Sequence, residues 1–189
     1  GACGRCAMSW SLNEIEALAR KSARGAGMSW GLAEETGKAT RLLLGNDIAA
    51  TDPLVQLLTL NDGADYTGIA PQIAAPSWVA SGGTLCPVAT GAALGDHAFL
   101  LEHAGITLGR VAFPMFLIPF AQVAARQIRA VLRLQWSDLT VSATPDAVYL
   151  DGALDALLAP FADTVACAIV AAPRGIACVQ QTALMCPIP

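Results

Sequence analysis

The chain has 189 residues, of which 54% are hydrophobic and only 14% carry a charge, and its formal net charge is −4. This length and composition predict one domain that buries a sizeable core. The eleven basic residues form no long run, so we expect no nucleic acid binding through phosphate neutralisation. The charged fraction is low for a globular protein, which predicts that a partner, often a second copy of the chain, hides part of the surface.

Residues 11–44 give the strongest structural signal and predict two helices joined by a tight turn. Ser11 and Glu14 have the spacing of a capping box. Gly25 and Gly27 supply the stop before the turn. Residues at three- and four-residue steps predict one apolar, buried face for the first helix: Leu12, Ile15, Leu18, Ala19 and Ser22.

The second helix is predicted to begin after Ser29, which has the right side chain for an N-cap. Gly31 and Gly37 are small enough to let another backbone approach closely. Glu34 and Lys38 have the spacing of a favourable ion pair along one helix. The apolar line of this helix is predicted to be Leu32, Thr36, Ala39, Leu42 and Leu43.

The same helix carries the first group of candidate site residues, charged side chains beside a tryptophan. Such a group predicts either a polar pocket or a solvated helix face with a tryptophan at an interface. The candidates are Trp30, Glu34, Glu35, Lys38 and Arg41.

The segments SLNEIEALARKSARGAG and SWGLAEETGKATRLL resemble the opening of a bacterial protein family of unknown function, whose members begin with a SLNEIEALARKAARGAG…WGLAEEAG pattern. The resemblance covers about the first forty residues well. It implies a soluble bacterial protein and carries over no catalytic residues. The first helix also resembles the N-terminal helix of the malate/L-lactate dehydrogenase-like oxidoreductases, a similarity that many amphipathic helices share.

Residues 1–10 are predicted to be a flexible extension. They are not expected to be a signal peptide, because no apolar stretch precedes the first helix. Without a signal peptide, the six cysteines are expected to be reduced in the cytoplasm. Cys3 and Cys6 have the spacing of half a zinc site or of a redox pair, but no second C-x-x-C accompanies them. We therefore predict no metal site, with these two thiols as the weak candidates.

Residues 45–95 are predicted to contain one short helix followed by extended chain. Asp52 and Pro53 have the residue types of an N-cap and a first helical position. Residues 66–95 lack charged side chains and contain three prolines, which predicts extended segments and short strands around the core. Residues 81–84 predict a turn.

Both histidines of the chain lie in residues 95–103, the second group of candidates. Asp96, His97, Glu102 and His103 are the residue types of a metal or acid–base site. The six-residue spacing of the histidines places them on different faces of a helix, or on one face of a strand. The alternative is a surface-exposed loop of acidic and histidine residues without a site.

The second half of the chain predicts a sheet. Residues 106–113 predict a strand and residues 120–131 a helix. Residues 131–136, 139–143 and 147–150 predict an antiparallel meander with one covered face. A short helix at 154–161 and a strand at 164–172 follow. Residues 111–125 are the most apolar stretch, but they are too short and too rich in proline to span a membrane.

Together these patterns predict an α+β fold, an N-terminal helical hairpin packed on a mainly antiparallel sheet. The domain is expected to cover residues 11–189, with helices in 11–61 and the sheet in 62–189. We expect a non-catalytic accessory or small-molecule- or partner-binding domain that acts as a homo-oligomer and uses no cofactor. The alternative is an enzyme between the helices and the sheet, with Glu34 or Glu35 as acid–base groups and Arg41 or His97 holding an anionic substrate.

Overall fold

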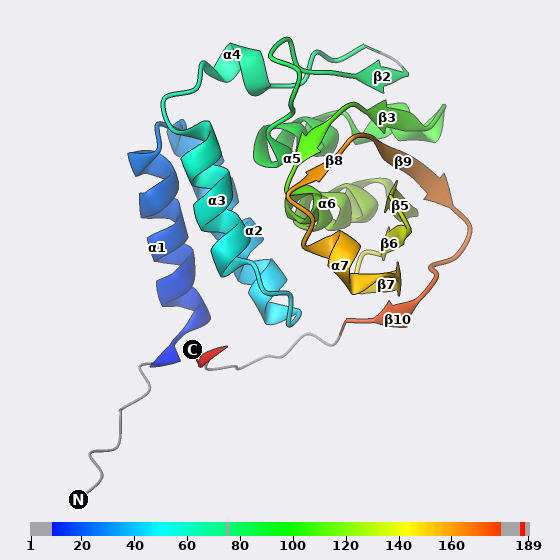
Figure 1. Ribbon diagram of the computed structural model, residues 1–189. Helices are drawn as coiled ribbons and strands as arrows, with labels where there is room; N and C mark the ends of the chain where they lie inside the picture. Colours follow the sequence, from blue (N-terminus) through cyan, green and yellow to red (C-terminus); the bar gives the residue numbers. More distant parts are fainter. Residues whose placement is uncertain (1–8, 75, 179–185, 188–189) are drawn as a thin grey trace, which may run out of the picture.

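The computed structural model describes residues 9–74, 76–178 and 186–187. Figure 1 shows three helices side by side, α1 (Leu12–Gly25), α2 (Trp30–Gly45) and α3 (Thr51–Asn61). Beside them a curved sheet wraps around α5 (Pro87–Asp96) and α6 (Ile118–Ile128). The α+β fold with an N-terminal helical hairpin and a mainly antiparallel sheet is thus confirmed.

The N-terminal ends of α1 and α2 form as the sequence predicts. The Ser11 hydroxyl accepts from the backbone N–H of Glu14, and the Glu14 carboxylate accepts from the backbone N–H of Ser11, which completes the capping box. Ser29 caps α2 in the same way by accepting from the backbone N–H of Leu32. These local hydrogen bonds fix where both helices begin.

The crossing of α1 and α2 is centred on Gly37. A Cβ atom at this position would lie 2.8 Å from the carbonyl oxygen of Glu16, so only glycine allows the two backbones to come so close. The same prediction for Gly31 is wrong, because nothing lies within 4 Å of a Cβ atom there.

The buried face of α1 is narrower than predicted. Ala19 and Ala23 are buried, and Leu12 and Ile15 are half-buried, but Leu18 is 51% exposed. The close crossing explains the difference, because backbones in contact leave room for alanine side chains and none for a leucine.

The segment after α2 holds two corrections. α3 begins at Thr51 with Ala50 as its N-cap residue, so Asp52 is not the cap. Residues 66–95 are not mainly extended: they contain α4 (Tyr66–Ile69), the short strand β2 (Ser77–Trp78) and the helix α5. Because α5 is built largely of small apolar residues and is buried on most sides, it has no polar face and gives no helical period.

The chain between α5 and the meander is irregular. The predicted strand at 106–113 is divided into β3 (Ile106–Leu108) and β4 (Val111–Ala112). The predicted helix at 120–131 begins earlier and ends earlier, as α6. The remaining short elements are η1 (Ala98–Glu102), η2 (Pro114–Leu117), α7 (Leu154–Leu157), β8 (Phe161–Ala162), β1 (Ser9–Trp10) and β11 (Cys186–Pro187).

Seven strands form the main sheet, in the order β10-β7-β6-β5-β9-β3-β2. The predicted meander is confirmed as β5 (Val131–Trp136), β6 (Leu139–Ala143) and β7 (Val148–Gly152). β9 (Val165–Val170) pairs with β5 and β3, and β10 (Ile176–Ala177) pairs with β7. Only the β2–β3 pair is parallel among the pairings of this sheet in the described ranges.

One face of the sheet packs on the core and the other does not. Leu132, Leu134 and Trp136 alternate along β5 toward the buried side, where α6 lies (Figure 1). Arg133 and Gln135 point to the opposite, outer face. Within the described residues, none of the helices is long and apolar enough to cross a bilayer.

Candidate functional site

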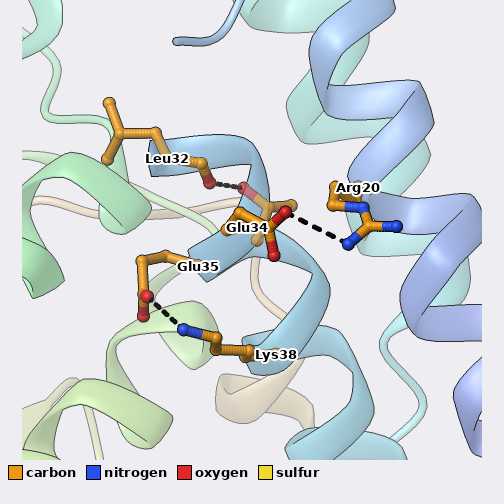
Figure 2. A network of polar contacts seen from close by, with 6 residues as sticks. Arg20, Leu32, Glu34, Glu35 and Lys38 are labelled. Atoms are coloured by element: carbon orange, nitrogen blue, oxygen red, sulfur yellow. Dashed lines mark hydrogen bonds and ion pairs between the residues drawn. The ribbon is translucent and has the colours of Figure 1, made fainter. Parts of the chain in front are cut away.

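The predicted charges on α2 are engaged in ion pairs. Arg20 of α1 contacts Glu34 at 3.1 Å, and Lys38 contacts Glu35 at 2.8 Å. Figure 2 shows Arg20 reaching across from α1, and Lys38 lying beside Glu35 on α2. The predicted Glu34–Lys38 pair is therefore wrong: the close helix crossing at Gly37 brings Arg20 to Glu34 instead.

A third pair joins the same two helices, between Arg41 and Glu16 at 3.0 Å. The hydrogen bond and the charge of Glu35 raise the pKa of Lys38 above its ordinary value, so this side chain stays a cation. All these pairs are partly exposed, and surface pairs of this kind contribute about 0.2–1 kcal/mol each. The Arg20–Glu34 and Arg41–Glu16 pairs join α1 to α2, whereas the Lys38–Glu35 pair lies within α2.

Trp30 stands apart from these pairs at the start of α2. Its side chain is 69% exposed, and the Arg24 guanidinium lies 4.5 Å from the centre of its ring. Arg24 also donates a hydrogen bond to the carbonyl of Met28. The tryptophan therefore helps to hold the turn between α1 and α2.

The second group of candidates lies at the end of α5 and in η1. His97 follows α5, with its ring 6.2 Å from the ring of the buried Trp78 and 6.0 Å from that of Phe99. Asp96 and His103 are exposed. Among the described residues, no hydrogen bond or ion pair joins these side chains to the group on α2, so a shared pocket of the two groups stays a prediction.

The cysteines of the described part of the chain give little support to a reactive thiol or a metal site. Burial raises the pKa of the Cys86 thiol, and it raises that of Cys167 to about 12, so both stay protonated. Cys3 and Cys6 lie outside the described residues. Within the described residues, no three His, Cys, Asp or Glu side chains gather as metal ligands would.

A hollow that the sequence did not indicate lies on the outer face of the sheet. It has a volume of about 470 Å³ and is lined by Arg133, Ser142 and residues 170–174. Arg133 comes from β5, Ser142 from β6, and Arg174 from the segment after β9. A volume of this size suits a small molecule.

The strand register builds the floor of this hollow. Arg133 lies opposite Ser142 on one side and opposite Ala168 on the other. Ser142 is only 1% exposed, although it points to the outer face. The segment after β9 covers it, and the backbone N–H of Arg174 donates to the Ser142 hydroxyl over 3.1 Å. This one hydrogen bond ties the second arginine to the floor.

The side chains of the two arginines have no carboxylate within ion-pair distance in the described chain, in contrast to Arg20 and Arg41. The residues that line the hollow include no acidic side chain either. Arg133 is half-buried in the sheet, where an unpaired cation is poorly solvated. The hollow therefore has the electrostatic character of an anion site.

The signal for this site in the sequence was weak. The alternation of residues 131–136 places Arg133 on the polar face of a strand, where an arginine is ordinary. Arg174 comes 41 positions later, and only the pairing of β5 with β9 brings the two together. A second hollow of about 420 Å³ lies at the β7–β10 edge and is lined mainly by apolar residues, among them Leu154 and Ile176.

Comparisons with known proteins find a family match in the first part of the chain. Residues 10–86 match the model of a family described as "Protein of unknown function (DUF3726)", which confirms the resemblance to a family of unknown function. The hollow between Arg133 and Arg174 lies outside the matched residues.

No curated protein matches the chain. Among solved structures, the chain is similar to the crystal structure of malate dehydrogenase from Entamoeba histolytica, with 10% sequence identity and a TM-score of 0.47. The similarity covers 77% of this chain and 48% of that one, so the chain spans about half the length of the enzyme it matches.

Proposed function

We propose that this protein is a non-catalytic domain that binds a small anionic molecule in the hollow between β5, β6 and residues 170–174. The observation that carries the proposal is that Arg133 and Arg174 line one hollow, which no acidic residue lines. Guanidinium groups bind carboxylates and phosphates through two parallel hydrogen bonds, which makes arginine the usual residue for such ligands.

The lining supports binding more than catalysis. Besides the two arginines and Ser142, the hollow is lined by Val170, Pro173 and two alanines. The described residues that line it include no histidine, carboxylate or thiol to move a proton or attack a substrate. Ser142 has no histidine or lysine beside it in the hollow to act as its base.

The net negative charge of the chain restricts anion binding to places where positive side chains gather. At −4, the protein as a whole repels anions, so attraction has to come from a local pair of cations. The binding is therefore expected to weaken as salt concentration rises.

Calorimetric titration with inorganic phosphate tests the proposal directly. We expect saturable binding by the wild-type protein, and a loss of about tenfold or more in Arg133→Gln, because a hydrogen bond to a charged group contributes about 1.5–3 kcal/mol. Lys21→Gln removes the same charge from the exposed side of α1 and is expected to bind as the wild type does. Absence of saturable binding, or equal affinity in Arg133→Gln, would overturn the proposal.

A further inference from the structure

Arg133 and Arg174 line the same hollow. Their number determines how many negative charges a ligand needs in order to neutralise them. Each guanidinium carries one positive charge at every physiological pH. Arg20 and Arg41 have their charges balanced by Glu34 and Glu16 within the protein. For Arg133 and Arg174, the described chain offers no such carboxylate.

The neighbours of Arg133 in the sheet leave its charge unbalanced on every side. Across the strands it faces Ser142 and Ala168, and along β5 on the same face it is flanked by Val131 and Gln135. All four are neutral. The nearest acidic residue on this face by register is Asp151, opposite Thr140 and two strands away from β5. A ligand anion at Arg133 therefore competes with no carboxylate of the described chain.

Arg174 adds a second positive charge. Its backbone N–H donates to the buried Ser142 hydroxyl, so the backbone of this residue is held at the rim of the hollow, which its exposed side chain lines. The hollow thus offers two cations to a ligand.

Resting on the function proposed above, we propose that the hollow selects molecules carrying two negative charges over molecules of the same shape carrying one. A monoanion balances one guanidinium and leaves the two to repel each other, whereas a dianion balances both. Two chemistries meet this requirement: one doubly charged group, as in a phosphate monoester, or two singly charged groups, as in a short dicarboxylate.

Two matched pairs of probes test the inference by calorimetric titration at pH 7.5. Methyl phosphate is nearly a dianion there, since a phosphate monoester loses its second proton near pH 6, and methyl sulfate is a monoanion of the same shape. Succinate and succinamate form the second pair, of equal length and with two charges and one. We expect the doubly charged member of at least one pair to bind about tenfold or more tightly than its singly charged match. The pair whose members differ in affinity shows whether the hollow binds a phosphate monoester or a short dicarboxylate.

Variants then test whether Arg174 causes the difference in affinity between the dianion and the monoanion. Arg174→Gln is expected to bring the affinity ratio close to one in the discriminating pair. Arg133→Lys, which keeps the charge but loses the fork of donors, is expected to weaken both members and to keep the ratio. Lys21→Gln is expected to change neither value.

The outcomes separate this inference from the proposed function. If both members of each pair bind the wild-type protein equally, the hollow is an anion site without charge selection, and only the inference fails. A ratio that survives in Arg174→Gln also overturns the inference. If none of the four probes binds, both proposals fail.

Discussion

Replacing Gly37 by alanine tests the crossing of α1 and α2 on which the N-terminal half depends. The added Cβ would lie 2.8 Å from the carbonyl oxygen of Glu16 and 3.3 Å from its Cγ. A side chain could rotate away from such a contact, but a helix carbonyl is held by the helix. The two helices therefore have to separate, which loosens the packing of Ala19 and Ala23.

Two opposing terms set the size of the effect. Alanine is more favourable than glycine inside a helix by about 1 kcal/mol. Overpacking a well-packed site costs about 1–3 kcal/mol, and a clash with backbone belongs in the upper part of that range. The net result is a loss of about 1–2 kcal/mol in the free energy of unfolding. For a chain of this size, this lowers Tm by about 2–8 °C.

Gly31 in the same helix provides the matched control. Nothing lies within 4 Å of a Cβ atom there, so Gly31→Ala keeps only the gain in helix propensity. We expect it to raise stability by up to about 1 kcal/mol. Urea unfolding followed by circular dichroism measures both variants. A Gly37→Ala protein as stable as Gly31→Ala would refute the account of the helix crossing.

Three further predictions follow from other parts of the molecule. Ser11→Ala is expected to cost about 1 kcal/mol of stability at pH 7 through loss of the helix cap. Hydrogen bonds from Ser11 lower the pKa of Glu14, so this carboxylate stabilises the fold above its unfolded pKa of 4.5 and stops doing so as pH falls through the lowered value. Chemical unfolding at pH 7 and pH 3 should therefore show a smaller effect of Ser11→Ala at pH 3, and an equal effect at both would contradict this reasoning. Gln122 on α6 is 1% exposed, and neither polar atom of its amide has a hydrogen-bond partner within the described chain, so Gln122→Met is expected to raise stability by about 1–3 kcal/mol, with the exposed Gln127→Met as control. A clear loss of stability in Gln122→Met would mean that the amide is hydrogen-bonded in solution. The homo-oligomer predicted from the low charged fraction is checked by light scattering on the eluting protein, where a strict monomer would end that prediction.

Much of the fold follows from local patterns in the sequence. The capping box at Ser11, the cap at Ser29 and the alternation along β5, β6 and β7 depend on residues within a few positions of one another. Hydrogen bonds and turns of this range need no tertiary contacts, so these elements could be predicted. α5 was missed for the complementary reason: a helix buried on most sides leaves no polar face, and hence no period, in its sequence.

The ion pairs between α1 and α2 were decided by the tertiary structure alone. Glu34 has Lys38 at a suitable spacing along its own helix, yet it pairs with Arg20 because Gly37 lets α1 come close. In the same way, the sequence determined that Arg133 lies on the polar face of a strand. That Arg174 shares a hollow with it depends on the order of strands in the sheet, since the pairing of β5 with β9 brings the segment after β9 to Arg133, 41 positions earlier in the chain.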